Sequence, residues 1–366
     1  MKILITGAHF TPAIAVIEEL KKFKGVEIIY VGRKTTMEGD QTQSQESIIL
    51  PETGVKFISI ITGRWQRVFT PYTIPSLLKI PIGFIQSFWI ILSEKPDVIL
   101  SFGGYVSVPV VFAGWLFSIP VIIHEPALLM GLANKICSPL ANKIALSFKN
   151  QNVLDGKIIA TGNPLRDEIL HPSGDIDLSY KEIFQEAKKS NLPTILITGG
   201  NQGSHIINLA IEHSLDKILK IACVIHVTGE SKFHDFERLQ KKQHNRYLVK
   251  KWIGKEWGIV LSKADLAISR AGINTLTEFA FFRIPALVIP IPYLYGDEQN
   301  KNARYFEKLG LVKILPQSKL SEALMKNVKI MLNNINSLKK EAERAQKFII
   351  PDAAKRLALE TVLLVK

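Results

Sequence analysis

The sequence predicts an α/β fold with two domains, each built on a doubly wound parallel sheet. Apolar runs alternate with amphipathic segments along the chain, and this alternation restarts after a break near the middle. The chain has 366 residues, whereas one domain typically holds ~100–150 residues. The predicted domains are residues 1–163 and 164–351, and a last helix at about 352–366 is expected to pack back on the first domain.

The first series of apolar runs predicts the N-terminal sheet. Near-continuous β-branched runs separated by helical patterns are typical of parallel strands buried on both faces. The predicted strands are Lys2–Thr6, Val26–Val31, Asp97–Ser101 and Val121–His124, and the first helix is predicted at Ala13–Phe23.

The second series follows the strand Ile158–Thr161, a Gly-Asn-Pro turn signal and a polar linker. Its predicted strands are Thr194–Thr198, Val224–Thr228, Leu248–Trp252, Leu266–Ser269 and Ala286–Pro290. Pro351 separates this series from the last helix, near Ala353–Leu364. Ligands of such sheets bind at the carboxyl ends of the strands, so we expect the site in a cleft between the two domains.

Two apolar stretches, Tyr72 to Leu92 and Gly104 to Ile123, approach the ~20 residues that a membrane-spanning helix needs. Both contain prolines and a glycine, such as Pro81 and Gly83 in the first. We therefore expect shorter buried elements or an interfacial segment, and no transmembrane helix. The N-terminus resembles a buried strand rather than a secretory signal.

The formal net charge of +13 favours an anionic partner: nucleic acid, an anionic membrane or a phosphorylated substrate. The alternative is simply a solvated basic surface. Nucleic acid is disfavoured because the basic residues are dispersed, without an arginine-rich or aromatic-basic motif. The two cysteines, Cys137 and Cys223, lie in apolar surroundings and are interpreted as buried free thiols in a reducing compartment.

The sharpest local motif is a glycine-rich turn between a predicted strand and a predicted helix. Its residues are Gly199, Gly200, Asn201, Gln202, Gly203 and Ser204. Glycines let backbone N–H groups approach an anion and the helix N-terminus adds its dipole, so this turn predicts a diphosphate site. A tight turn without a ligand is the alternative. The sequence has no GxxxxGK[ST] motif, so it is not a P-loop nucleotide hydrolase.

Three other strand ends carry polar or glycine-rich turns. Ser101 to Ser107 could face a sugar or an acceptor, or be only structural. In Ser269 to Glu278, Glu278 could bind ribose hydroxyls, although its spacing from Thr275 favours a helix-capping role. Asp297 to Ala303 offers side chains for sugar hydroxyls, or is a solvated helix start.

Two further features concern acid–base and metal chemistry. His9 follows the first strand, and histidine is the usual general base near neutral pH, although a lone histidine beside a turn is more often structural. Asp175-Ile176-Asp177 matches a metal–diphosphate pattern, but it lies in a linker and is interpreted as coincidence. No His, Cys and carboxylate cluster predicts a metal site.

Taken in order, these motifs resemble the MurG-type family, whose members add N-acetylglucosamine to lipid I and so make lipid II for peptidoglycan. The resemblance runs from about Ile3 to beyond Ala303. It rests on seven anchors: 103–107 (GGYVS), 124–125 (HE), 131–134 (GLAN), 161–166 (TGNPLR), 199–203 (GGNQG), 269–272 (SRAG), and Gln299 with Asn302-Ala303.

The resemblance implies a GT-B fold, two Rossmann-like domains with the donor mostly on the C-terminal one, and it implies roles. The Gly199–Ser204 loop and Gly272 hold the donor with Arg166 nearby, the backbone at Ile253 meets uracil, Glu278 binds ribose, and Glu298 and Gln299 bind the sugar. His9 is the candidate base, and Gly103, Gly104, Tyr105, Glu125 and Asn134 lie on the acceptor side. It implies no metal and no cofactor.

The sequence departs from the family pattern at three places. The first turn is shortened to Gly7-Ala8-His9, the HEQN stretch reads His124-Glu125-Pro126-Ala127, and Glu298 stands where the family often has His or Gln. The first two departures lie on the acceptor side, so donor binding is the better supported half of the prediction.

The function that the resemblance implies is inverting, metal-independent transfer of N-acetylglucosamine from UDP-N-acetylglucosamine to undecaprenyl-linked lipid I. The expected location is the cytoplasmic face of the cell membrane, where apolar Tyr72–Leu92, with Lys79 and nearby Arg64 and Arg67, would dock peripherally on an anionic surface. The alternatives are a GT-B transferase acting on another glycolipid, a UDP-N-acetylglucosamine epimerase, which would need additional carboxylates, and an inactive sugar-nucleotide-binding scaffold.

Overall fold

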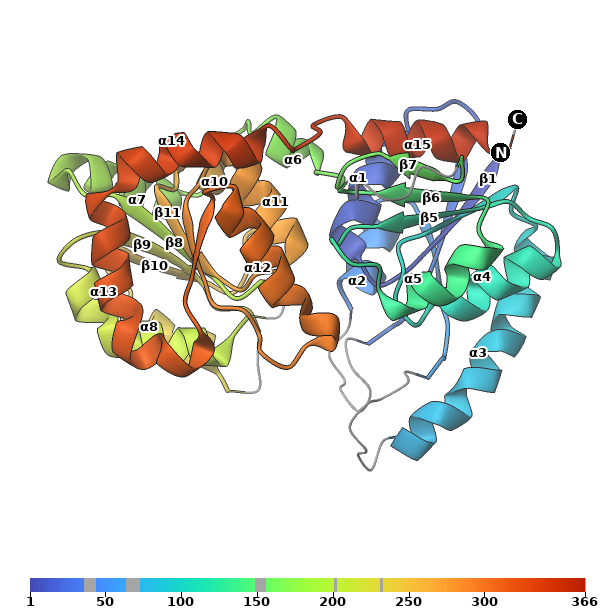
Figure 1. Cartoon of the computed structure of the whole chain (residues 1–366), viewed down its shortest axis with the longest axis horizontal. Coiled ribbons are helices and arrows are strands. Elements are labelled where there is room, and N and C mark those ends of the chain that lie inside the picture. Colours follow the sequence, from blue (N-terminus) through green and yellow to red (C-terminus); the bar gives the residue numbers. More distant parts are fainter. Residues whose placement is uncertain (36–43, 64–72, 149–155, 201–202, 231–232, 366) are drawn as a thin grey trace. The chain divides into compact units, whose positions relative to one another are not determined.

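The computed structural model describes the whole chain except residues 36–43, 64–72, 149–155, 201–202, 231–232 and 366. It divides into two compact units (Figure 1). Unit 1 is Met1–Arg166 together with Ile350–Lys366, and unit 2 is Asp167–Ile349. The chain therefore leaves unit 1 a few residues after the predicted boundary at 163/164, and its last residues belong to unit 1 again.

Unit 1 contains a seven-stranded, wholly parallel sheet in the order β3-β2-β1-β4-β5-β6-β7. Its strands are β1 (Lys2–Thr6), β2 (Glu27–Gly32), β3 (Lys56–Ser59), β4 (Val98–Ser101), β5 (Val121–Glu125), β6 (Lys143–Leu146) and β7 (Ile158–Ala160). Thr6 of β1 pairs with Ser101 of β4. The turns after these two strands therefore leave the sheet side by side.

Helix α15 (Ala353–Leu363) brings the end of the chain back onto α1 (Phe10–Leu20). The two helices lie side by side in Figure 1, and Leu357 and Val362 of α15 join Val16 and Leu20 of α1 in one buried cluster. The core on this face of the sheet is thus assembled from both ends of the sequence.

Helix α3 (Thr73–Glu94) is one helix of 22 residues, so the first alternative for Tyr72–Leu92, shorter buried elements, is wrong, and the second, an interfacial segment, stays a prediction. Pro75 lies in the first turn, where a missing N–H costs little. Pro81 lies inside the helix, and Gly83 allows close contact, because a Cβ there would lie 2.5 Å from Thr62. Among the described residues, α3 is the one helix long and apolar enough to cross a membrane by length and composition.

The second apolar stretch does divide into short elements, as predicted. It forms α4 (Ser107–Leu116), which packs on α3, and the start of β5. Pro120 lies between the helix and the strand, where a residue without an N–H and with a fixed φ suits neither element.

Unit 2 contains a six-stranded parallel sheet in the order β10-β9-β8-β11-β12-β13. Its strands are β8 (Thr194–Thr198), β9 (Cys223–Val227), β10 (Tyr247–Lys250), β11 (Leu266–Ser269), β12 (Ala286–Val288) and β13 (Val312–Ile314). Thr198 pairs with Ser269, so the turns after β8 and β11 are neighbours at one edge. Two parallel Rossmann-like sheets confirm the predicted fold class.

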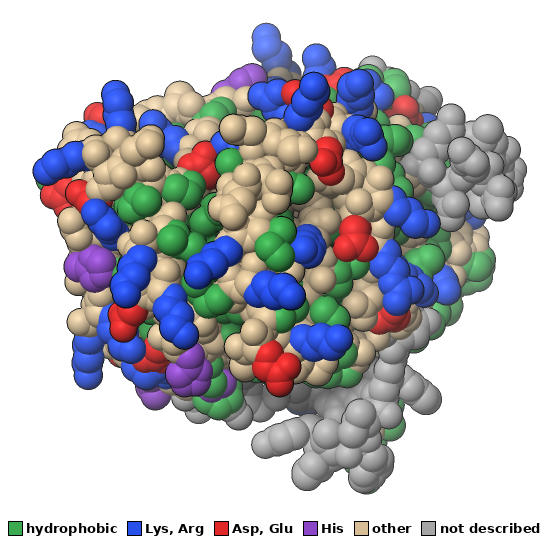
Figure 2. Space-filling model, turned by 60° about the vertical axis from the view of Figure 1, so that its left-hand side comes forward, with side chains coloured by type: hydrophobic (Ala, Val, Ile, Leu, Met, Phe, Trp, Pro, Cys, Tyr) green, Lys and Arg blue, Asp and Glu red, His purple; other side chains and the backbone are tan. Residues whose placement is uncertain are grey.

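The remaining α-helices cover the sheets or connect their strands. They are α2 (Gln45–Glu52), α5 (Leu132–Cys137), α6 (Asp167–Leu170), α7 (Leu178–Ser190), α8 (His205–Ile218), α9 (Asp235–Gln240), α10 (Trp257–Lys263), α11 (Ile273–Phe282), α12 (Glu298–Lys308), α13 (Leu320–Asn333) and α14 (Ile335–Gln346). Cys137 and Cys223 are buried free thiols. On the face drawn in Figure 2, Lys and Arg side chains are scattered among acidic and apolar ones rather than gathered in one patch.

Candidate functional site

In unit 1, the turns that follow β1 and β4 interlock. The amide of Ala8 donates to the carbonyl oxygen of Gly103 at 2.9 Å. A Cβ on Gly104 would lie 2.5 Å from Cβ of Ala8, and one on Gly103 would lie 2.8 Å from Oδ1 of Asn134. Both glycines have positive φ, +69° and +82°. These positions therefore require glycine. Because glycine has no side chain, the turn that contains His9 can pack directly against the predicted acceptor-side turn.

Glu125 organises the loop that follows β5. Its buried carboxylate accepts hydrogen bonds from the amides of Ala127 (3.0 Å) and Gly131 (2.8 Å) and from the side-chain amide of Asn134 (2.9 Å). Burial raises the pKa of Glu125, and the three donors oppose that shift because they stabilise the ionised form. Glu125 and Asn134 thus act together, beside Gly103, as one structural group.

His9 is the N-cap residue of α1. Burial lowers the pKa of His9 to about 4, so its imidazole is neutral at physiological pH and has a nitrogen lone pair. His124 lies deeper, and burial lowers its pKa to about 3. Nε2 of His124 lies 3.3 Å from the carbonyl oxygen of Gly162 and 3.1 Å from the hydroxyl oxygen of Ser147.

In unit 2, the glycine turn after β8 has a conformation that larger residues could not adopt. A Cβ on Gly199 would collide with the amide of Ser204, and one on Gly203 would collide with the carbonyl oxygen of Thr228. Gly200 has φ +81° and, among the described residues, no atom within 4 Å of its Cβ position. Asn201 and Gln202 lie outside the described residues. In the donor loop, as we call Gly199–Ser204, the described backbone is therefore tightly packed at Gly199 and Gly203 and open at Gly200.

Arg270 is a candidate site residue that sequence reasoning did not single out, although it lies in the predicted turn Ser269 to Glu278. Its side chain is buried, its Nε donates to Oγ of Ser204 at 3.1 Å, and its Nη1 donates to the carbonyl oxygen of Ile289 at 2.9 Å. Burial lowers its pKa, and no carboxylate of the described residues contributes to the shift. A buried cation against the donor loop makes this end of the sheet favourable for an anion.

Helix α11 follows β11 and begins after Gly272, an N-cap in extended conformation (φ −69°, ψ 135°). Thr275 and Glu278 therefore lie inside the helix, so the capping-box interpretation of their spacing is wrong. Glu278 is buried, and its Oε2 accepts a hydrogen bond from the indole Nε1 of Trp257 at 2.8 Å. Among the described residues no atom lies within 4 Å of the Cβ position of Gly272.

Gln299 connects the turns after β11 and β12. Its Oε1 accepts from the amides of Ala271 (3.3 Å) and Ile291 (3.0 Å), which leaves its amide nitrogen as the group that it could offer to a sugar. Buried Asn302 donates to the carbonyl oxygen of Ala271 at 3.3 Å. Glu298 is the first residue of α12, and Ile253 lies in the loop between β10 and α10.

The structure thus separates the predicted residues into two clusters. His9, Gly103, Gly104, Tyr105, Glu125 and Asn134 belong to unit 1, and the donor loop, Ile253, Gly272, Glu278, Glu298 and Gln299 belong to unit 2. Arg166 was predicted in the donor domain but is the last residue of unit 1 before the chain enters unit 2.

The linker aspartates have local roles. Asp177 caps α7 by accepting from the amide of Ser179 at 2.8 Å, and Asp175 lies 3.4 Å from Nζ of Lys181. In the part of the chain that the structure describes, no three His, Cys, Asp or Glu side chains gather as metal ligands would.

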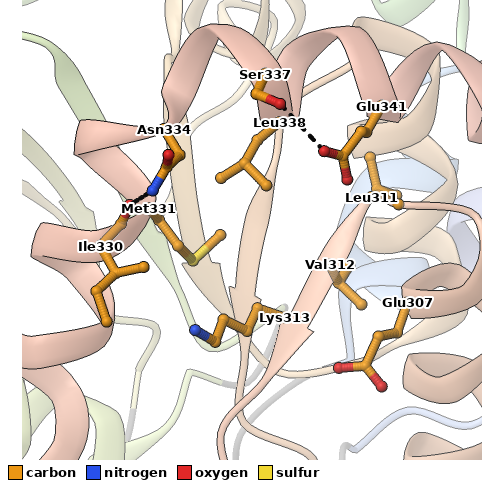
Figure 3. Close-up of a pocket in the computed structure, with 11 residues that line it drawn as sticks. Glu307, Leu311, Val312, Lys313, Ile330, Met331, Asn334, Ser337, Leu338 and Glu341 are labelled. Atoms are coloured by element: carbon orange, nitrogen blue, oxygen red, sulfur yellow. Dashed lines mark hydrogen bonds between the residues drawn. The ribbon is translucent and has the colours of Figure 1, made fainter.

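A cavity of about 290 Å³ lies elsewhere in unit 2, against β13, α13 and α14 (Figure 3). Its polar side chains partly bond with one another or with nearby backbone, as in the hydrogen bond from Ser337 to Glu341. None of the predicted site residues lines it.

Comparison with known families gives two matches that together cover most of the chain. Residues 6–146 match the glycosyltransferase family 28 N-terminal domain, and residues 194–357 match the glycosyltransferase family 28 C-terminal domain.

Curated relatives extend the match over nearly the full length. A UDP-N-acetylglucosamine–N-acetylmuramyl-(pentapeptide) pyrophosphoryl-undecaprenol N-acetylglucosamine transferase from Halothermothrix orenii is 34% identical, over 96% of this chain and 95% of that protein. A protein of the same name from Clostridium kluyveri is 33% identical, over 88% of this chain and 89% of that protein.

Solved structures share the fold. The crystal structure of Acinetobacter baumannii MurG superposes with a TM-score of 0.71 at 24% identity, covering 99% of both chains. A UDP-N-acetylglucosamine 2-epimerase from Neisseria meningitidis superposes with a TM-score of 0.63 at 17% identity, covering 99% of this chain and 100% of that one. At these identities the likeness concerns the fold alone.

Proposed function

Because the chain belongs to the MurG-type transferases of glycosyltransferase family 28, we propose that it transfers N-acetylglucosamine from UDP-N-acetylglucosamine to undecaprenyl-linked lipid I. The acceptor hydroxyl oxygen attacks the anomeric carbon of the donor. The bond from that carbon to the diphosphate oxygen breaks, UDP leaves with the electron pair, and the anomeric configuration inverts.

The observation that carries this proposal is the anion-binding character of one strand edge in unit 2. The donor loop precedes α8, the open glycine Gly272 precedes α11, and the buried Arg270 reaches Ser204 between them. Helix N-termini and a buried cation stabilise the negative charge that develops on the leaving diphosphate. This is the source of leaving-group stabilisation in a metal-independent reaction.

His9 supplies the base in this proposal. Its pKa, lowered to about 4 by burial, leaves the imidazole unprotonated at neutral pH. The proton of the acceptor hydroxyl passes to His9, directly or through a water molecule, as the new bond to the sugar forms. The interlocked turns Gly7–His9 and Phe102–Gly104 hold His9 next to the acceptor-side residues.

Docking on the membrane follows from a lipid-linked acceptor, and α3 is the surface that supports it. Its exposed large side chains recur at helical spacing on one face: Ile74, Leu78, Ile82, Ile85, Trp89 and Leu92. Its buried positions are mainly small or polar, such as Ser76, Gly83 and Ser87. A helix that exposes its apolar side and buries its polar side is suited to an apolar environment outside the protein.

We propose that this apolar face of α3 lies in the membrane interface on the cytoplasmic side, with Lys79 toward anionic headgroups. Packing of α3 on α4, where Phe84 meets Phe112 at 5.4 Å between ring centres, argues for a helix lying on the surface rather than one spanning the bilayer. Arg64 and Arg67, predicted as further cations of this surface, lie outside the described residues.

Turnover with a lipid I analogue tests the proposed reaction. UDP release and product formation are measured with UDP-N-acetylglucosamine in the presence of a chelator, with UDP-glucose as the comparison donor. The expected product is the N-acetylglucosaminyl derivative with inverted anomeric configuration by NMR. Epimerised donor in place of transfer, or no product with a folded and UDP-binding protein, would refute the assignment.

A further inference from the structure

The first residue of α10 is a tryptophan whose side chain reaches α11. Trp257 is half-buried, and its indole Nε1 donates to Oε2 of Glu278 at 2.8 Å across the contact between the two helices. An indole nitrogen has one hydrogen and no lone pair to accept with, so this bond has only one possible direction. The contact joins residues that are distant in sequence.

Glu278 needs such a partner if it is to bind a ribose. A glutamate side chain has three rotatable bonds, and fixing it in one conformation costs rotamer entropy. A partner that already holds it in the free protein removes that cost from ligand binding. Because the indole is uncharged, this bond orients the carboxylate without neutralising its charge, so the carboxylate can still form charge-assisted hydrogen bonds with further donors.

The number of acceptor positions also fits. A carboxylate has about four lone-pair sites on its two oxygens, and the indole occupies one of them, on Oε2. Four sites exceed the one that the indole uses and the two that a ribose would need. The 2′- and 3′-hydroxyls of a ribose are two adjacent donors that match two adjacent oxygens.

We propose that Trp257 is a positioning residue for the nucleoside of the donor, and that it holds Glu278 so that the carboxylate receives both ribose hydroxyls. This rests on the proposed function, in which Glu278 binds the ribose of UDP. A consequence is that Trp257 sets the preference of the protein for a ribonucleotide over a 2′-deoxyribonucleotide, although it touches neither hydroxyl.

The test compares the affinities of UDP and 2′-deoxy-UDP, measured by calorimetry, in the unmodified protein and in Trp257→Phe. Phenylalanine keeps an aromatic ring and removes the N–H. We expect the dissociation constant of UDP to rise about 5-fold, the scale of ordering one long side chain, with a smaller rise for 2′-deoxy-UDP. In turnover, KM for the donor should rise while kcat changes little, since the lost interaction is the same in ground and transition states.

A double-mutant cycle separates positioning from simple packing. Glu278→Gln should weaken UDP binding alone, and adding Trp257→Phe should then weaken it little further, because the indole acts through the carboxylate. Equal weakening of UDP and 2′-deoxy-UDP by Trp257→Phe, additive losses in the cycle, or no effect at all would each overturn the proposal.

Two controls keep the outcome interpretable. Thermal unfolding checks that Trp257→Phe is folded, and Trp257→Tyr, whose donor lies elsewhere on the ring, repeats the comparison with a second variant. If UDP binds the unmodified protein but Glu278→Gln has full affinity, the ribose role of Glu278 fails and the inference with it. If the unmodified protein binds no UDP, the proposed function itself is refuted.

Discussion

Gly272 offers the cleanest test of where the donor binds. Gly203 would be the more obvious target in the donor loop, but a side chain there would collide with the carbonyl oxygen of Thr228 within the protein itself. A side chain on Gly272 meets no described atom within 4 Å, and its φ of −69° suits any residue. A substitution at Gly272 therefore changes the ligand site without straining the fold.

Serine at this position should have opposite effects on stability and on binding. As an N-cap, serine accepts a hydrogen bond from the backbone N–H of Asn274 or Thr275, and it is better than glycine by a few tenths of a kcal/mol. Those N–H groups belong to the first turn, where helical hydrogen bonds cannot satisfy them and a phosphate would bind. The serine side chain would compete with the phosphate for one of these N–H groups. Loss of one hydrogen bond to the charged phosphate, worth ~1.5–3 kcal/mol, should weaken UDP binding by at least ~10-fold.

The assay is calorimetric titration with UDP, paired with thermal unfolding of the same samples. Gly131→Ser is the matched control, because Gly131 is also a glycine N-cap with extended backbone (φ −63°, ψ 157°) but belongs to unit 1. It should leave the UDP affinity unchanged. If Gly272→Ser unfolds no earlier than the unmodified protein and binds UDP equally well, the start of α11 is not part of the donor site.

Three further outcomes are expected. His9→Ala should lower kcat by ~10²–10⁴ with little change in UDP affinity, and near-full turnover of this variant would place the base elsewhere. In the unmodified protein, kcat should fall on the acid side near pH 4 rather than near pH 6.5, because burial lowers the pKa of His9 to about 4. Burial lowers the pKa of His226 to about 3, so between pH 6.5 and 3 the unfolded chain binds more protons at this residue than the folded one. The free energy of unfolding, measured with urea, should therefore decrease as the pH is lowered through this range, by up to ~1.4 kcal/mol per pH unit for this histidine. In His226→Gln the free energy of unfolding should depend less on pH. The double substitution Leu78→Gln and Trp89→Gln should reduce sedimentation with anionic vesicles and leave the unfolding midpoint unchanged, because both side chains are 68% exposed. The control Leu178→Gln, at an exposed residue of unit 2, should change neither vesicle binding nor the midpoint. Unchanged vesicle binding of the double variant would exclude the apolar face of α3 as the docking surface.

The fold class was predictable because buried parallel strands carry their signal locally. Lys2–Thr6 and Thr194–Thr198, for example, are strands with the predicted bounds, since each is an apolar run that ends in a glycine turn. The site turns could be located from the same signal, because a strand end followed by glycines can be recognised in the sequence without knowledge of the tertiary structure. The roles assigned to these residues stay predictions.

The features that were wrongly predicted from the sequence, or that it did not indicate, depend on contacts between distant elements. The helix-breaking residues Pro81 and Gly83 predicted an interrupted segment, yet α3 continues through both. Its large apolar side chains do recur at helical spacing, but they are exposed instead of packing into a core. The bonds from Trp257 to Glu278 and from Arg270 to Ser204 each join two elements that only the fold brings together. No local pattern predicts such a pairing, because neither partner lies within a helical turn of the other.

The return of the chain to unit 1 has a consequence for synthesis on the ribosome. Residues 167–349 form the whole of unit 2 and are translated before α15 exists, so that unit can complete its core while translation continues. Unit 1 begins first but finishes last, because the surface of α1 around Val16 and Leu20 stays uncovered until Leu357 and Val362 have been made. A nascent chain that stops after residue 349 therefore carries one finished unit and one with an open apolar face, which is the kind of surface that chaperones and proteases recognise.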